Sequence, residues 1–151
     1  PFSFLKLVRS NIETTKFDEA DLSGADFEGT GFRECKANKL KLTGGKLDGV
    51  SFHKCDLGGA NFSETRGQRC AFSLATLDKA LFAQAHFTYS NFSEAEAKGA
   101  SFQGAILSFS RFDKALLERS SFSGACLKSA SLLRKSASTR ADSTCTIDCT
   151  S

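Results

Sequence analysis

The chain repeats every five residues. Phe, Leu or Ile occupies 24 of the 27 positions that run in steps of five from residue 2 to residue 132, and the exceptions are Ala37, Gly67 and Ala97. The positions two residues earlier, from 5 to 130, hold small side chains everywhere except at Leu5 and Leu40. The other three positions of each repeat are mostly Ser, Gly, Lys, Asp, Glu and Arg. Each repeat therefore has one large and one small inward side chain, and three side chains that face solvent.

Neither a helix nor a flat strand can use this period. Five residues advance an α-helix by roughly 500°, so an apolar stripe with this spacing would drift around the helix. A flat β-strand alternates its side chains with a period of two. A chain that turns a corner after every five residues keeps each large residue inward, at the middle of a side. The pattern therefore predicts a solenoid over residues 1–134.

Individual repeats carry a recognisable motif. Good copies are Ala20-Asp21-Leu22-Ser23-Gly24, Ala25-Asp26-Phe27-Glu28-Gly29 and Ala60-Asn61-Phe62-Ser63-Glu64. They resemble the unit A-(D/N)-L-x-x of the pentapeptide-repeat family, and the resemblance covers residues 1–134 without a slip of register. It implies an all-β fold: a right-handed quadrilateral β-helix with four pentapeptides per coil, here about 6.5 coils.

A second period, of 20 residues, supports a four-sided coil. Taken in steps of 20, the central positions 12 to 132 read Ile, Phe, Phe, Phe, Phe, Phe, Leu, and positions 2 to 122 read Phe, Leu, Leu, Phe, Phe, Phe, Phe. The other two series hold three Phe in 13 positions and favour Leu. We therefore expect Phe on two opposite sides of the coil and Leu on the other two, in rungs ~4.8 Å apart.

The repeat is imperfect at three central positions and at its ends. At Ala37, Gly67 and Ala97, either neighbouring side chains such as Leu40 fill the space, or the solenoid has a bend or a small cavity. Residues 135–151 leave the pattern and are rich in Ser and Thr. Because an open end exposes strand edges and Phe rings, we expect a short non-repeat C-terminal cap or tail there.

Composition and charge exclude some classes of partner. Twenty basic and 17 acidic residues give a net charge of +3. This is too mild for a nucleic-acid or membrane-surface partner, for which a clustered basic surface is expected. No run approaches the ~20 apolar residues of a membrane span. We therefore expect a protein partner or a multi-subunit complex, no nucleic acid, and no membrane-spanning segment, and the oligomeric state stays open.

The residues that could carry chemistry are few and scattered. Cys35, Cys55 and Cys70 occupy small inward positions and are expected to be buried thiols that act as small hydrophobes. Cys145 and Cys149 are a candidate disulfide that closes the tail, which would indicate an oxidising compartment. The only histidines, at positions 53 and 86, fall on different faces. No nucleotide or calcium motif and no zinc-ligand spacing is present, so we predict no enzyme, no cofactor and no metal site.

Apolar residues at outward positions mark a candidate interaction face. Tyr89 and Phe109 differ by 20, so they are expected to stack in one exposed column, with Arg69 preceding them. The same side carries Cys126. Two weaker candidates for exposed apolar residues, Leu81 and Leu116, fall on other sides. Three interpretations of these outward apolar residues stay open: they are scattered surface hydrophobes, or the C-terminal tail covers them, or they form the site for a partner. The candidate protein-binding residues are Arg66, Arg69, His86, Tyr89, Ile106 and Phe109.

A rigid solenoid without chemistry predicts a non-catalytic scaffold or an accessory subunit of a larger assembly. The family is abundant in cyanobacteria and plastids, so the resemblance implies a photosynthetic or other membrane complex as one setting, with a lean toward the chloroplast or thylakoid lumen or another oxidising compartment. Other members of the family protect DNA gyrase by mimicking DNA, which is the alternative function. A third interpretation is a secreted effector or a module linked to an enzyme outside this chain.

Overall fold

Three short strands lie in one parallel sheet at the N-terminal end. The computed structural model describes residues 5–131, and within this range it contains no α-helix. The strands are β1 (Asn11–Glu13), β2 (Gly31–Arg33) and β3 (Ser51–His53), in the order β1-β2-β3. Their register pairs each residue with the one 20 positions later, as in Ile12 with Phe32 and Phe32 with Phe52.

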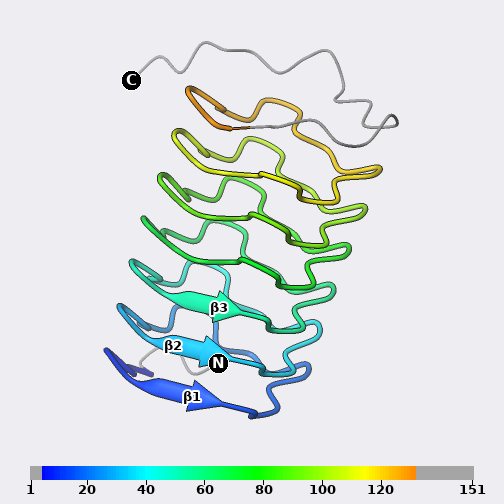
Figure 1. The fold of residues 1–151 in the computed structure, drawn as a ribbon. Helices are drawn as coiled ribbons and strands as arrows, with labels where there is room; N and C mark the ends of the chain where they lie inside the picture. The colour runs from blue at the N-terminus through cyan, green and yellow to red at the C-terminus, as the bar shows by residue number, and fades with distance from the viewer. Residues whose placement is uncertain (1–4, 132–151) are drawn as a thin grey trace.

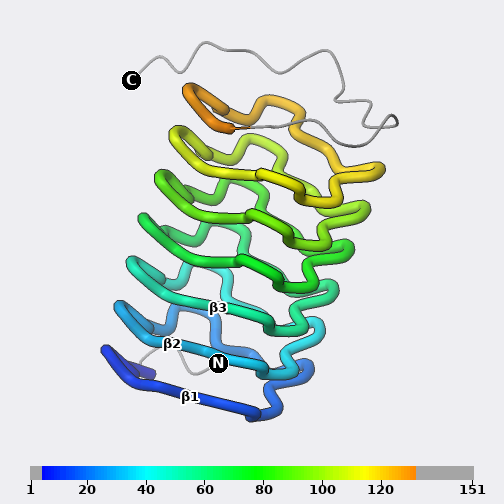
Figure 2. Tube along the Cα trace, viewed as in Figure 1, coloured from blue at the N-terminus to red at the C-terminus, as the bar shows by residue number. Residues whose placement is uncertain are grey.

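The same 20-residue register continues along the rod as isolated parallel bridges. Lys16 pairs with Lys36, Asp21 with Lys41, and Asp26 with Lys46. These bridges and the strands form four columns five residues apart, so each coil has four sides and 20 residues. The described residues make slightly more than six coils. Figures 1 and 2 show the coils stacked in a right-handed sense from blue to orange, which confirms the predicted quadrilateral β-helix.

We number the four sides in chain order. The first side carries β1–β3 and is centred on Ile12, and the second is centred on Phe17. The third side is centred on Leu22 and the fourth on Phe27. Each side recurs every 20 residues, so residue 87 is central on the fourth side in the same way as residue 27.

Every corner of the coil uses left-handed backbone. The φ angle is positive at every fifth residue from Arg9 to Ser129, and Gly occupies only some of these positions. The small residue that follows commonly donates its N–H to the carbonyl three residues before it, as from Ala25 to Leu22 at 3.1 Å. A non-glycine residue in this conformation costs roughly 1–2 kcal/mol. The corner side chains point outward, so they are positions where a strained backbone presents a side chain to solvent.

Phe rings form two ladders inside the rod, as the 20-residue period predicts. On the first side Phe72 and Phe92 stack with centroids 4.8 Å apart and planes 5° apart. On the third side Phe82 and Phe102 stack at 4.8 Å and 11°. The ladders meet edge to face, as at Phe72 and Phe82 with 5.8 Å and 85°. Offset and edge-to-face pairs are the favoured aromatic geometries, so both ladders fit one narrow core.

The exceptions to the repeat are accommodated in different ways. A Cβ built on Gly67 would lie 2.7 Å from Cε1 of Phe87, so this ring fills the space of the missing side chain. Ala37 borders a small apolar cavity of about 10 Å³ that Leu40 also lines. A cavity of this size without polar groups stays dry. A neighbouring side chain therefore fills the space at Gly67, whereas a small cavity remains at Ala37.

Three cysteines are buried free thiols, as predicted. Cys35 and Cys55 lie in adjacent coils at the same corner, and Cys70 lies at another corner. Burial raises the pKa of the Cys55 thiol to about 12 and that of the Cys70 thiol to about 12. These groups are therefore protonated at neutral pH and are poor nucleophiles.

Candidate protein interface

The fourth side brings the six candidate binding residues together. Parallel bridges join Arg66 to His86 and His86 to Ile106. Beside them, the N–H of Arg69 donates to Thr88 O at 3.0 Å. The candidate residues therefore form two adjacent columns across three coils, which we call the fourth-side strip. Its members are Arg66, Arg69, His86, Tyr89, Ile106 and Phe109.

Two exposed aromatic rings lie at the centre of the fourth-side strip. Tyr89 and Phe109 stack with centroids 4.8 Å apart and planes 6° apart. The residues are 56% and 43% exposed, and they lie outside the core ladders. Both occupy corner positions, with φ of 58° and 62°. The predicted stacking of these two residues is confirmed, and it presents a flat apolar surface to solvent.

The charges around the two rings have one sign. Arg66 and Arg69 lie one coil below Tyr89, and Lys128 lies one coil above Phe109. All three are exposed, and none forms a salt bridge within residues 5–131. From residue 66 to residue 129 the outward positions of the fourth side contain no Asp or Glu. The aromatic pair is thus uncharged itself and is bordered at both ends by cations.

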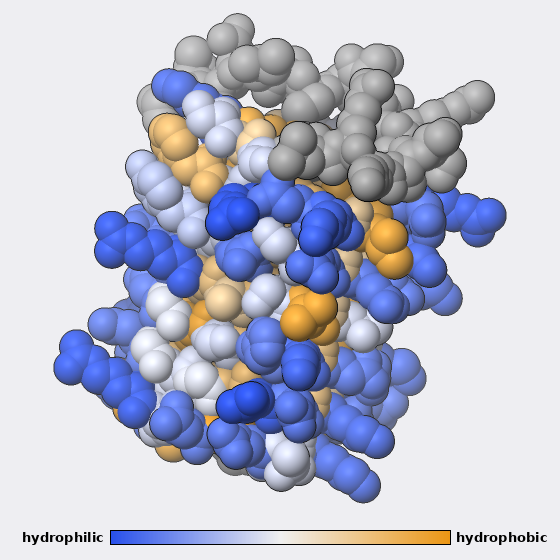
Figure 3. Space-filling model, in the orientation of Figure 1, coloured by the Kyte–Doolittle hydropathy of each residue, from blue (hydrophilic) through white to orange (hydrophobic). Residues whose placement is uncertain are grey.

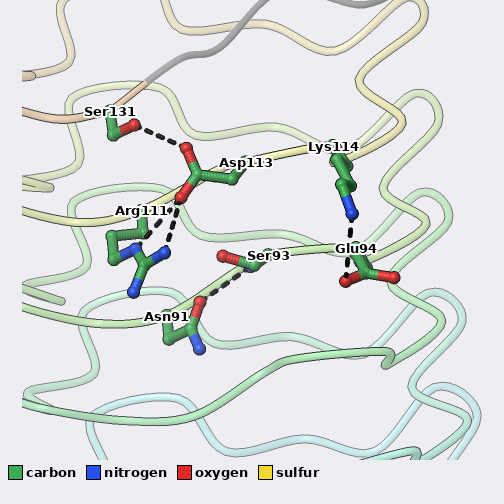
Figure 4. A network of polar contacts seen from close by, with 7 residues as sticks. All are labelled: Asn91, Ser93, Glu94, Arg111, Asp113, Lys114 and Ser131. Carbon is green, nitrogen blue, oxygen red and sulfur yellow. Dashed lines mark hydrogen bonds and ion pairs between the residues drawn. The ribbon is translucent and has the colours of Figure 1, made fainter.

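On the first side, by contrast, oppositely charged side chains pair with each other. Arg111 donates two hydrogen bonds to Asp113, at 3.0 and 2.9 Å, and the Ser131 hydroxyl donates to the same carboxylate at 2.6 Å (Figure 4). The hydrogen bond from Ser131, followed by that from Arg111, lowers the pKa of Asp113. Lys114 and Glu94 lie 4.0 Å apart in the same view. Figure 3, in the orientation of Figure 1, shows a mainly hydrophilic surface with isolated hydrophobic residues.

Two further exposed leucines lie away from the strip. Leu74, 45% exposed, is a corner residue of the first side that the sequence analysis missed, although its outward position was readable from the repeat. Leu81, 43% exposed, lies on the third side as predicted. Leu116, on the second side, is half-buried, as is Ile106 of the strip. The equivalent positions in the adjacent coils hold polar residues for both leucines, so neither forms an exposed aromatic stack.

Cys126 continues the column of Ile106 and is disulfide-bonded. Its sulfur accepts a hydrogen bond from the Ser108 hydroxyl at 3.1 Å, since a disulfide sulfur carries no proton to donate. The predicted disulfide of Cys145 with Cys149, and the predicted cap at 135–151, lie outside the described residues.

The described residues show no arrangement for catalysis. His53, on the first side, lies 3.1 Å from the Ser73 hydroxyl, and His86 is on the fourth side. Neither has a carboxylate hydrogen-bond partner within residues 5–131. In the same range no group of His, Cys, Asp and Glu could hold a metal ion. No helix in this part of the chain could cross a membrane.

Comparison with known proteins identifies the repeat. The family model described as pentapeptide repeats matches eight copies, over residues 2–33, 46–82, 68–104 and 98–132. No curated protein matches the chain.

Solved structures with the same kind of repeat are similar. A pentapeptide repeat protein from the thylakoid lumen of Arabidopsis thaliana is 23% identical over 76% of this chain and 70% of that one, with a TM-score of 0.41. QnrB1, a plasmid-mediated fluoroquinolone resistance protein, is 20% identical over 83% and 90%, with a TM-score of 0.44. HetL, a protein of heterocyst differentiation regulation from the cyanobacterium Nostoc, is 18% identical over 87% and 86%, with a TM-score of 0.28. The match of the family model over most of the chain means that this protein belongs to the pentapeptide-repeat family.

Proposed function

We propose that the protein is a non-catalytic scaffold or accessory subunit that binds a protein partner through the fourth-side strip. The observation that carries the proposal is the exposed stack of Tyr89 on Phe109. Aromatic residues and arginine are the types enriched at the energetic centre of protein interfaces, and charged residues are depleted there. The strip combines an uncharged aromatic centre with arginines at its edge.

The backbone holds this surface ready for binding. The N–H of Tyr89 donates to Ser108 O at 3.0 Å, and the N–H of Phe109 donates to Lys128 O at 2.8 Å. Each ring therefore sits on a rung fixed by the next coil, and the two rings restrict each other. A surface that is ordered before binding loses less conformational entropy when a partner docks. The rigid rod thus supports tight binding through a small number of side chains.

The two aromatic residues lie at corner positions of the coil. Tyr89 and Phe109 both adopt positive φ, where glycine is the least strained residue. A bulky side chain there costs stability, and burial in the core does not compensate, because both side chains face solvent. Most corners of the rod hold a non-glycine residue, Leu74 among them, so the exposed stack rather than the corner strain distinguishes these two residues.

The alternative, a mimic of DNA that protects gyrase, requires an acidic surface along the rod. The acids Asp18, Glu19, Asp21, Asp26 and Glu28 crowd the N-terminal coils. From residue 66 to residue 129 the charged residues at the outward positions of the fourth side are all cations, namely Arg66, Arg69 and Lys128, and the net charge of the chain is +3. This distribution favours the scaffold. A place in a photosynthetic or other membrane assembly is the finer expectation, and co-purification with such a complex tests it.

Affinity capture from native extract tests the proposed function. The immobilised wild type is compared with the double variant Tyr89→Ser, Phe109→Ser and with the matched control Leu74→Ser. Leu74 is also a corner residue, with φ of 59° and 45% exposure. We expect the wild type and Leu74→Ser to retain the same partner, and the double variant to lose it. Equal retention by all three proteins would place the partner site elsewhere.

A further inference from the structure

The geometry points to an acidic, apolar segment of the partner as the ligand of the fourth-side strip. In this proposal a bulky apolar side chain of the partner lies on the Tyr89–Phe109 stack. One of its carboxylates meets Arg66 and Arg69 below the stack, and a second meets Lys128 above it. The inference rests on the proposed function and adds the chemistry of the partner.

The first support is that no cation of the strip forms a salt bridge within residues 5–131, whereas some of the cations elsewhere do. Lys39 lies 3.0 Å from Glu19, and Lys98 lies 3.8 Å from Glu118, each across one coil of the second side. One coil above Arg69 and Arg66 the equivalent positions hold Tyr89 and His86 instead. A guanidinium presents a planar fork that binds carboxylates in a bidentate manner. Asp48 lies on the same side one coil below, and its carboxylate accepts the backbone N–H of Gln68 at 2.7 Å. The two exposed arginines have no salt-bridge partner among residues 5–131, so their guanidinium groups are available to an external carboxylate.

The second support is the spacing. Arg69, Tyr89 and Phe109 occupy successive coils, and Lys128 lies in the coil after Phe109. With rungs ~4.8 Å apart, about 14 Å separates the level of the arginines from that of the lysine. An extended peptide rises ~3.3 Å per residue, so about four residues cover this distance. A short segment with carboxylates at both ends and apolar residues between them matches the strip.

The third support is that the strip fits neither a nucleic-acid backbone nor an anionic membrane surface. A phosphate backbone would bring evenly spaced negative charge onto the uncharged rings at Tyr89 and Phe109, where nothing neutralises it. An anionic membrane surface would be expected to select cations gathered in one patch, whereas Arg66 and Arg69 are separated from Lys128 by the aromatic pair. The alternation of cation, aromatic pair and cation along one side favours a peptide.

The chain contains its own probe for this binding. Tyr89 is the only tyrosine and the protein has no tryptophan, so tyrosine fluorescence reports on the strip alone. We would titrate the whole chain with the synthetic peptide acetyl-Asp-Glu-Leu-Leu-Ser-Glu-Asp-amide. The neutral counterpart acetyl-Asn-Gln-Leu-Leu-Ser-Gln-Asn-amide keeps the length and the apolar centre. The expected result is a saturable change of Tyr89 fluorescence with the acidic peptide, and a Kd at least tenfold higher with the neutral one.

Matched variants separate the strip from general attraction between opposite charges. Arg66→Ala, Arg69→Ala should raise the Kd of the acidic peptide at least tenfold. The control Arg119→Ala removes an exposed corner arginine of the second side, with φ of 60° against 57° at Arg69, and should leave the Kd unchanged. Circular dichroism checks that each variant is folded. Equal binding of the two peptides, an equal effect of Arg119→Ala, or no binding of the acidic peptide would overturn the inference.

Two further measurements distinguish a failure of this inference from a failure of the proposed function. Binding to vesicles of anionic lipid without binding to the acidic peptide overturns the inference in favour of a membrane surface. A captured partner that is lost with Tyr89→Ser, Phe109→Ser but fully retained with Arg66→Ala, Arg69→Ala also overturns it, while the proposed function stands. If the aromatic variant keeps the partner, the proposed function itself fails.

Discussion

The ring of Phe87 occupies the space that a side chain at Gly67 would need. The two residues are central on the fourth side in adjacent coils, and a Cβ at residue 67 would lie 2.7 Å from both Phe87 Cε1 and Cys70 Sγ. The coil that carries Arg66 and Arg69 is thus packed by a residue of the coil that carries Tyr89. Core packing and the presentation of the strip are coupled at this point.

Gly67→Ala should therefore destabilise the solenoid, although alanine is the usual small residue of this fold. Overpacking a tight core costs about 1–3 kcal/mol, and urea unfolding followed by circular dichroism measures it. Adding Phe87→Leu, the residue type at positions 47 and 107 of the same side, should recover part of this loss. A Gly67→Ala variant as stable as the wild type would show that Phe87 does not hold this space.

We expect the buried Phe ladders to contribute much more to the free energy of unfolding than the exposed pair of Tyr89 and Phe109. Phe72 is fully buried between Phe52 and Phe92, so Phe72→Ala should lower the free energy of unfolding by about 3–5 kcal/mol. Phe109→Ala should cost no more than about 1.5 kcal/mol, the value of an aromatic pair. Similar losses in the two variants would mean that the strip serves the fold rather than a partner.

The repeat predicted much of this structure, because each side needs one large inward residue and each corner needs a small one. That rule alone places Phe109 on the rung above Tyr89, since two outward residues 20 apart must lie on neighbouring rungs. It does not predict that Phe87 fills the space at Gly67, because this depends on how the ring tilts along the rod. Leu74 was missed although the same arithmetic places it outside, and the disulfide of Cys126 has no signature in the repeat.

The corner backbone gives a prediction about glycine. Gly99 has φ of +67°, and an added Cβ would meet only Lys79 Cγ at 3.7 Å, an ordinary contact. Gly99→Ala should therefore cost about 1 kcal/mol through backbone strain alone. Lys79→Gly, at φ of 58°, should be neutral or stabilising. Thermal unfolding of the two variants measures whether their stabilities change in these opposite directions. Stabilisation by Gly99→Ala would contradict the predicted cost of backbone strain at this corner.

The buried thiols make stability depend on pH in the alkaline range. The pKa of Cys70 is raised from 9.0 to about 12 by burial. Its contribution is complete below pH 9, and it is lost as the pH rises toward 12, because the unfolded thiol ionises first. The free energy of unfolding should fall over this window, and Cys70→Ala should reduce the slope. An unchanged slope in the variant would show that Cys70 does not contribute.

The same burial predicts low reactivity. Iodoacetamide at pH 8 should leave Cys55 and Cys70 unmodified in the folded protein and modify both in urea, because only the thiolate reacts and only the unfolded chain exposes it. Mass spectrometry after a timed reaction measures this. Rapid modification of either thiol in the folded protein would contradict the closed core.

Site-specific photo-crosslinking tests the central claim most directly. Benzoylphenylalanine is placed at position 89, at position 109, or at the control position 74, and each purified protein is irradiated in native extract. We expect one common crosslinked partner from positions 89 and 109 and none from position 74. A partner that crosslinks equally at position 74, or that co-purifies with the protein but crosslinks at neither 89 nor 109, would contradict the assignment of the fourth-side strip as the binding site.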